Sequence, residues 1–181
     1  DQSPRSANDV QAIVLEAMAR LQERLHGDPL NVVNNFYNDD GSHKDENACR
    51  DQMLIVLGSL PYGIQFHPES AMPQGNRADS GFAFDTMLVP LEAKGQWHQD
   101  VWTAPTCQLD RLYASDYRAS SKGIYVVFWF GDAPMDMQLS LVAGLPADRR
   151  ADIAVVVLDV TRPPPKLKAR SPHRARSVGQ L

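Results

Sequence analysis

The sequence has few cysteines and no long apolar run, and both deficits exclude classes of protein. Only two of the 181 residues are cysteines, Cys49 and Cys107. Two thiols cannot form the disulfide framework of a small secreted domain. No stretch approaches the roughly 18–20 consecutive apolar residues that a membrane helix requires. We therefore expect a protein of the reducing cytoplasm that does not enter a membrane.

The chain also lacks a secretory signal and two common ligand-binding signatures. It opens on a polar segment at Asp1, without the apolar core of a signal peptide and without Met, which suggests a piece of a longer protein. The cysteines and the five histidines, including His26, His67 and His173, form none of the spacings that bind zinc. No glycine-rich loop of the kind that cradles phosphates is present, which argues against ATP binding. Cys107 has no local signature of a cysteine protease around it.

Positive charge is scarce until the last twenty residues. The net charge is −4, from 18 basic and 22 acidic residues. The segment after Val160 holds six basic residues and no acid: Arg162, Lys166, Lys168, Arg170, Arg174 and Arg176. The first 160 residues therefore hold 12 basic against 22 acidic residues, a balance of −10. The basic tail can bind a polyanion by counterion release, or it can be a disordered segment that keeps the chain soluble.

The hydrophobic pattern predicts an α/β fold with a mixed sheet of about five strands flanked by helices. Amphipathic spacing predicts helices over 8–26 and 45–58, the second capped by Asp45 and ended by Gly58, with a loop over 27–45 between them. Strands are expected over 63–67, 78–84 and 87–94, and the last two form a hairpin. Further elements are a helix over 101–118, a buried strand over 123–130, a short helix over 137–148 and a buried strand over 152–160.

These elements are expected to form one domain over residues 1–160. Its helical N-terminal part spans 8–58, and the core that carries chemistry spans 45–160. A basic, proline-rich and disordered tail over 161–181 follows the domain. Within the second strand of the hairpin, Pro90 cannot donate a backbone hydrogen bond, so it predicts an edge or a bulge there.

The hairpin places two carboxylates opposite each other. If its turn is Asp85-Thr86, paired residue numbers sum to 171, and Asp79 then faces Glu92 with Cβ atoms about 4.5–5.5 Å apart. Facing carboxylates repel each other unless a cation compensates, and such hard oxygen ligands suit Mg²⁺ or Mn²⁺. Because side chains alternate along a strand, Glu92 and Lys94 point to one face and Ala93 to the other. The Ala93 carbonyl is a plausible third metal ligand.

The same residues carry a family resemblance. Asp79, followed after a hairpin by Glu92-Ala93-Lys94, resembles the PD-(D/E)xK signature of restriction-endonuclease-like nucleases, although Ala78 stands where that signature has proline. The resemblance implies that Asp79 and Glu92 bind a catalytic metal, and that Lys94 orients a water or stabilises charge on phosphorus. Glu46 stands where many members carry an accessory acid.

The expected order of elements also resembles that superfamily's core of helix, three-strand meander, helix and strand. In addition, the segment from Gln108 to Tyr113 is similar to a helix of RecB-like members in which a Gln and a Tyr approach the site, though here five residues rather than four separate them. The resemblance covers roughly residues 45–130. It implies a restriction-endonuclease-like core and a Mg²⁺-dependent endonuclease or exonuclease acting on nucleic acid, DNA in preference to RNA. Such a domain can be the effector of a larger defence or repair protein, or act as a homodimer, although the sequence does not indicate which residues would form a dimer interface.

Each candidate residue also has a structural interpretation. Glu92 and Lys94 could form a surface ion pair, and Asp79 could form a buried salt bridge with Arg77 or Lys94. Glu46 could simply charge the first turn of its helix favourably. These alternatives leave open a non-catalytic module of the same fold that binds nucleic acid or a protein partner. A ribonuclease is a third possibility.

Four further side chains are open in the same way. Gln108 could face the phosphate or be solvated. His98 could contact the substrate, although a local hydrogen bond is the commoner role for a lone histidine. Trp97 and Trp102 are expected in the core or as capping residues rather than as platforms on which bases stack.

Overall fold

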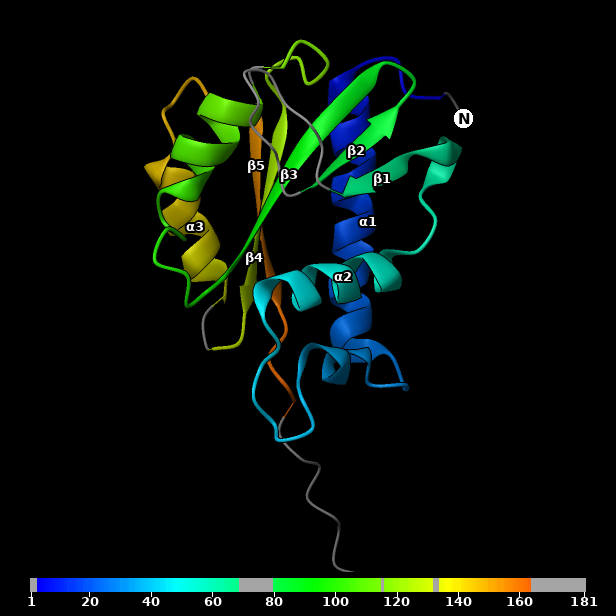
Figure 1. Cartoon of the computed structure of the whole chain (residues 1–181), viewed down its shortest axis with the longest axis vertical. Coiled ribbons are helices and arrows are strands. Elements are labelled where there is room, and N and C mark those ends of the chain that lie inside the picture. Colours follow the sequence, from blue (N-terminus) through cyan, green and yellow to red (C-terminus); the bar gives the residue numbers. More distant parts are fainter. Residues whose placement is uncertain (1–2, 69–79, 115, 132–133, 164–181) are drawn as a thin grey trace, which may run out of the picture.

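A computed structural model describes residues 3–68, 80–114, 116–131 and 134–163, without the side chains of 111–113 and 134 (Figure 1). The fold is α/β, as expected, with one mixed five-stranded sheet in the order β1-β2-β3-β4-β5. The strands are β1 (Gln65–Pro68), β2 (Ser80–Phe84), β3 (Met87–Gly95), β4 (Gly123–Trp129) and β5 (Ile153–Asp159). The first three form an antiparallel meander, and β4 and β5 follow parallel to β3.

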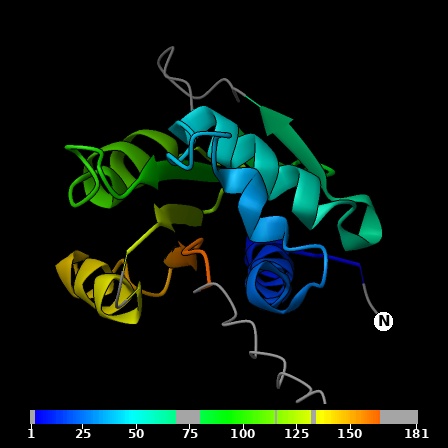
Figure 2. The same cartoon turned by 90° about the horizontal axis from the view of Figure 1, so that it is seen from below.

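Helices cover both faces of this sheet. The helices are α1 (Ala7–Gly27), η1 (Val32–Phe36), α2 (Glu46–Leu57), η2 (Pro61–Gly63), η4 (Pro105–Tyr113) and α3 (Pro134–Gly144). Seen along the sheet, α1 and α2 lie on one side and η4 and α3 on the other (Figure 2). Within the described part of the chain, no helix is both long and apolar enough to cross a membrane.

Two hydrophobic cores follow from the alternation of side chains along the central strands. Val89, Leu91 and Ala93 of β3 belong to the core under α1 and α2. Leu88 and the β4 residue Tyr125 belong to the core under η4 and α3. Glu92 and Lys94 share the parity of Leu88, so their side chains lie on the η4 side of the sheet.

Pro90 illustrates how the sheet accommodates a proline in a central strand. β3 lies between β2 and β4, so it is not an edge strand. At Pro90, however, β3 is paired only with Gly81 of β2, because its pairing with β4 begins one residue later at Leu91. The proline therefore occupies a local edge, where a missing backbone donor costs no bond to β4.

The segment 101–118 is the largest difference from the expected elements. In place of one long α-helix, it contains turns and then η4, a π-helix with i→i+5 bonds such as Ala114 N–H to Leu109 O (2.8 Å). After η4, the Asp116 carboxylate accepts the backbone N–H of Arg118 (2.8 Å). Such an Asx turn competes with helical hydrogen bonds and ends the helical segment.

Candidate functional site

The end of β3 carries a buried ion pair. Glu92 is 2% exposed and Lys94 is 6% exposed, although β3 is the central strand of the sheet. Lys94 Nζ lies 2.7 Å from Glu92 Oε1. The interpretation of these two residues as a surface ion pair is therefore wrong. The intervening Ala93 points into the opposite core, as the alternation predicted.

The hairpin that precedes this pair has the expected register. Phe84 pairs with Met87 and Ser80 pairs with Leu91, so paired residue numbers sum to 171 and the turn is Asp85-Thr86. Asp79, the next residue before Ser80, lies outside the described residues, as does its alternative partner Arg77. The register on which the prediction for Asp79 was based is therefore confirmed. The position of Asp79 opposite Glu92 itself stays a prediction.

Glu46, which is distant from the pair in the sequence, contacts it in the fold. As the first residue of α2, it accepts the Gly95 N–H at Oε2 (2.9 Å) and lies 3.5 Å from Lys94 Nζ through Oε1. The Lys94 ammonium therefore lies within 4 Å of two carboxylates. Glu46 also occupies the first turn of its helix, so its favourable interaction with the helix dipole holds as well.

The described part of this cluster contains two carboxylates and one ammonium. Glu92 and Lys94 are both buried, so their charges lie where water is largely excluded. Low local polarity strengthens the attraction of such a group for a further cation.

Tyr125 is a neighbour that the sequence analysis did not single out. It pairs with Glu92 in the β3–β4 register and is fully buried, and its hydroxyl donates to the Val101 carbonyl (2.6 Å). Burial raises the pKa of Tyr125, and the negative charges of Glu92 and Glu46 raise it further. The hydroxyl therefore stays protonated and anchors the segment that leads into η4. Its position in an apolar strand gave no sign of this role.

Gln108 lies on η4, which packs against β3 and β4. Its Oε1 is buried and accepts no hydrogen bond from the residues described here. Since buried amide oxygens are normally paired, a buried oxygen without a described partner makes Gln108 a candidate for contact with a ligand. Gln108 makes no described hydrogen bond to Glu46, Glu92 or Lys94.

The π-helical winding of η4 bears on the spacing of Gln108 and Tyr113. In an α-helix, positions five apart point in clearly different directions, whereas the wider i→i+5 winding reduces the angle between them. Positions 108 and 113 therefore lie about one turn apart along η4. The side chain of Tyr113 is outside the described part of the structure.

The remaining candidates are one histidine with a local hydrogen bond and two exposed tryptophans. His98 Nδ1 accepts the Asp100 N–H (3.1 Å), which supports the local role for this histidine. Trp97 and Trp102 are 42% and 57% exposed, so the expectation of core tryptophans is wrong. The ring of Trp97 instead stacks on His43, with centroids 3.8 Å apart.

Comparison with known families adds one match. A family model described as a domain of unknown function (DUF8371) matches residues 10–132, more than half of the chain. The chain belongs to this family. No curated protein and no solved structure matches it. The matched range runs from α1 through β4, so the DUF8371 region contains Glu46, Glu92, Lys94 and Gln108.

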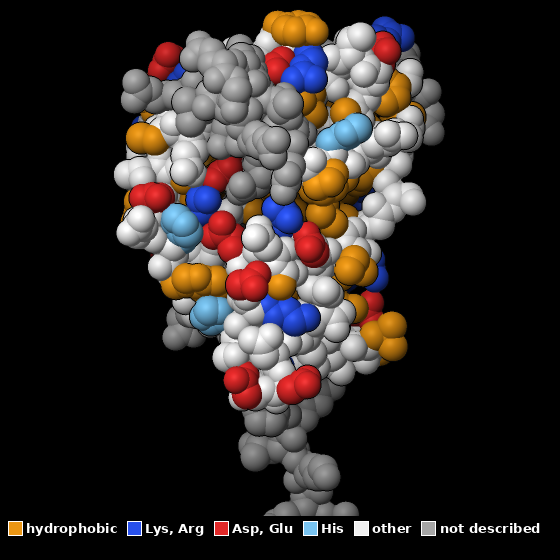
Figure 3. Space-filling view, in the orientation of Figure 1, with side chains coloured by type: hydrophobic (Ala, Val, Ile, Leu, Met, Phe, Trp, Pro, Cys, Tyr) orange, Lys and Arg blue, Asp and Glu red, His pale blue; other side chains and the backbone are white. Residues whose placement is uncertain are grey.

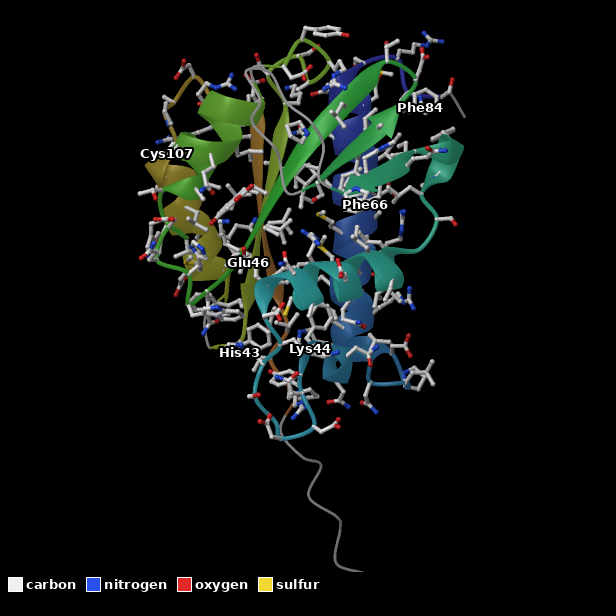
Figure 4. All side chains as sticks on the ribbon, in the orientation of Figure 1. His43, Lys44, Glu46, Phe66, Phe84 and Cys107 are labelled. Carbon is white, nitrogen blue, oxygen red and sulfur yellow. The ribbon has the colours of Figure 1, made fainter. Side chains whose placement is uncertain are left out.

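The donor set of the DUF8371 domain fits a hard divalent cation. Glu92 and Glu46 carry carboxylate oxygens and Ala93 carries a backbone carbonyl, and Mg²⁺ and Mn²⁺ prefer oxygen ligands. Within the described ranges, no three His, Cys, Asp or Glu residues come together as a preformed metal group. The predicted ligand Asp79 lies outside those ranges. Glu46 sits where α2 begins, beside the end of β3 (Figure 4).

Proposed function

We propose that the DUF8371 domain hydrolyses phosphodiester bonds in nucleic acid with a bound Mg²⁺ or Mn²⁺ ion, and that DNA is its substrate. The observation that carries this proposal is the position of Lys94. Its ammonium lies 2.7 Å from Glu92 and 3.5 Å from Glu46, at the buried end of a central strand. Acidic residues can hold the metal ion of metal-assisted phosphodiester hydrolysis, and an ammonium beside them can stabilise the charge that develops on the phosphate.

Stability alone gives little reason for such a cluster. Burial of charged groups carries a desolvation cost of several kcal/mol per ion, which their mutual attraction only partly offsets. Apolar residues at positions 92 and 94 would continue the apolar character of β3 at no such cost. Buried, mutually perturbing charges occur preferentially at functional sites, although structural ion pairs also exist.

The order of elements supports a restriction-endonuclease-like core. The order of elements along the chain is the one that the resemblance implies: helix α2, the meander β1–β3, the helical segment η4 and the strand β4. In this arrangement the Glu-x-Lys motif lies on the third strand of the meander. Glu46 lies on the preceding helix and Gln108 on the following one.

Each residue has a role in the proposed reaction. Asp79, Glu92 and the Ala93 carbonyl would hold the metal, with Glu46 as an accessory acid. The bound ion would polarise the scissile phosphate and lower the pKa of a coordinated water. Lys94 would then donate hydrogen bonds to that water or to a phosphate oxygen, stabilising the charge that develops. Gln108 would position the phosphate or the attacking water.

A non-catalytic nuclease-fold module is the second candidate, and the charge distribution favours it. The first 160 residues carry a balance of −10, and the face in Figure 3 bears acidic and basic side chains intermixed. A body of this charge attracts nucleic acid weakly unless basic residues elsewhere or bound cations assist. Such a module would bind nucleic acid or a protein without cutting it.

Plasmid cleavage distinguishes the two candidates. The whole 181-residue chain is incubated with supercoiled plasmid and with single strands, in Mg²⁺, in Mn²⁺ and in chelator. We expect metal-dependent cleavage that Lys94→Ala reduces by about 100-fold or more. The matched control is Lys122→Ala, which removes a lysine paired with Asp152 (2.8 Å), a residue outside the proposed site.

Thermal melting completes the test. Binding of Mg²⁺ or Mn²⁺ to the folded state raises the melting temperature, and Glu92→Gln should reduce that rise. Absence of both cleavage and a metal-induced shift would refute the proposed hydrolysis and favour the binding module.

We also propose that the protein works in the reducing cytoplasm. Both cysteines are free in the structure. Burial raises the pKa of the Cys49 thiol to about 12, so this thiol is inert, whereas Cys107 is exposed. An exposed free thiol is compatible with a reducing compartment.

A further inference from the structure

An open aromatic hollow lies beside the charged cluster. Its volume is about 420 Å³, and six residues line it: Asn38, His43, Lys44, Asp45, Ala48 and Trp97. Within it the rings of His43 and Trp97 are nearly parallel, at 14°, with centroids 3.8 Å apart. Phe130 supports this stack from 5.1 Å away from His43. Two exposed aromatic rings thus pack against each other and against Phe130.

The hollow and the charged cluster share two segments of chain. Lys44 and Asp45 immediately precede Glu46. Figure 4 shows Lys44 and Glu46 on the stretch that enters α2. On the other segment, the Trp97 ring lies so close over Gly95 that a Cβ there would overlap it. Gly95 in turn donates its N–H to Glu46. A strand whose phosphate lay at Lys94 would therefore pass next to the hollow.

The chemistry of the hollow favours a flat, uncharged group as its occupant. Exposed aromatic faces stack with nucleobases of any sequence, because every base has a π-face. The Asp45 carboxylate, held in place as the cap of α2, makes the hollow itself unfavourable for a phosphate. Lys44 has no ion-pair partner among the described residues and can attract a phosphate next to the base. The volume is in the range of about 300–1,000 Å³ typical of small-ligand sites.

We propose that the hollow binds one unpaired nucleobase of the strand that enters the Glu92–Lys94 site. A base inside a duplex has both faces covered by its neighbours, so only a base outside the helix can stack on His43. The substrate class is therefore single-stranded nucleic acid, or a frayed or extruded nucleotide of a duplex. This inference rests on the proposed function for its substrate, but its test requires no cleavage.

Binding without cleavage tests the hollow. Fluorescence anisotropy is recorded with the whole chain, with Ca²⁺ in place of Mg²⁺, on a labelled oligothymidylate, on an abasic strand of the same length and on a blunt duplex. We expect the oligothymidylate to bind roughly tenfold or more tightly than the abasic strand. His43→Ala should remove this preference, and His43→Phe should keep it because the ring remains.

Two further variants separate stacking from other effects. Trp102→Ala removes a more exposed tryptophan outside the hollow and should leave the preference unchanged. Lys44→Gln should weaken binding to the abasic strand and to the oligothymidylate alike. It should also reduce the slope of log affinity against log salt concentration by about one, the value expected for one phosphate contact. Thermal melting confirms that each variant is folded.

Several results would overturn the proposal. These are equal affinity for the abasic strand and the oligothymidylate, tighter binding of the blunt duplex, no binding at all, or an equal loss in Trp102→Ala. The outcome is independent of the cleavage assay. Cleavage without a base preference would support the proposed hydrolysis and refute base binding in the hollow. A base preference without cleavage would support base binding and refute the hydrolysis.

Discussion

The N–H of Gly95 donates a 2.9 Å hydrogen bond to Glu46, which joins the last residue of β3 to the first residue of α2. The two residues are 49 positions apart in the chain. Because Glu46 is also 3.5 Å from Lys94, the orientation of α2 and the placement of the charged cluster depend on the same side chain. The acid is thus part of the fold as well as of the proposed site.

Substitution of Glu46 separates its hydrogen bond from its charge. Glu46→Ala leaves the Gly95 N–H without this acceptor and should lower the free energy of unfolding by about 1–2 kcal/mol. Glu46→Gln keeps an acceptor oxygen and should cost less. Urea denaturation measures both. Glu16→Ala is the control: its exposed pair with Arg20 should contribute no more than about 0.5 kcal/mol, and an equal loss there would contradict the prediction.

A methyl group at Gly95 should disturb Trp97. The added Cβ overlaps the indole ring, so Gly95→Ala should lower the free energy of unfolding by about 1–3 kcal/mol and alter tryptophan fluorescence. In a Trp97→Ala background the same change should cost little, and a double-mutant cycle in urea gives the coupling energy. Gly27→Ala is the control, since a Cβ there meets nothing within 4 Å. A coupling energy near zero would show that the ring moves aside freely.

Local patterns in the sequence were sufficient to predict the hairpin and α2. The two-residue turn at Asp85-Thr86 fixes the register from β2 to β3, and the alternation of apolar residues fixes which face is buried. Asp45 and Gly58 mark the ends of α2 because their chemistry acts within one helical turn. Such signals depend only on neighbouring residues, and the structure confirms them.

Other features depend on contacts between distant residues and could not be predicted in this way. The sequence does not show that Glu46 meets Gly95, or that Trp97 stacks on His43, because both contacts arise from tertiary packing. The π-helical winding of η4 was also missed, since its sequence fits an α-helix equally well. Similarly, the polar loop expected over 27–45 contains η1, whose Phe36 is buried despite the surrounding Asn and Asp residues.

Acid should weaken the fold through Asp116. This carboxylate is 3% exposed and accepts Nη2 of Arg118 at 2.7 Å; its hydrogen bonds to Arg118 hold its pKa below the usual range. A carboxyl whose pKa is lower in the folded state contributes stability above its unfolded pKa, and loses it as the pH falls through the folded pKa. Asp116→Asn should therefore cost about 1–3 kcal/mol near pH 7 and progressively less below pH of about 4.

Urea denaturation at several pH values measures this difference. Asp136→Asn is the control, because Asp136 is exposed in the first turn of α3 and its substitution should change the free energy of unfolding little. If the gap between the parent chain and Asp116→Asn were the same at pH 3 as at pH 7, the ionised carboxylate would not be the source of the stability.

Gln108 offers a direct test of whether a polar atom is held for function at a cost in stability. Its buried Oε1 accepts no hydrogen bond among the described residues, and an unpaired buried acceptor costs about 1–3 kcal/mol. Gln108→Leu removes that atom with little change in volume. It should raise the free energy of unfolding by about 1 kcal/mol in the absence of metal and nucleic acid. The same variant should lower plasmid cleavage by about tenfold or more, if the amide positions the phosphate or the water.

Gln11 is the matched control for this substitution. It is also a buried glutamine, but its Nε2 donates to the carbonyls of Gly123 (2.8 Å) and Asp152 (2.7 Å). Gln11→Leu should therefore lower the free energy of unfolding by about 1–3 kcal/mol, the opposite direction from Gln108→Leu. Destabilisation by both variants would mean that the Gln108 amide supports the fold. Its orientation would then cease to be evidence for a phosphate at the end of β3.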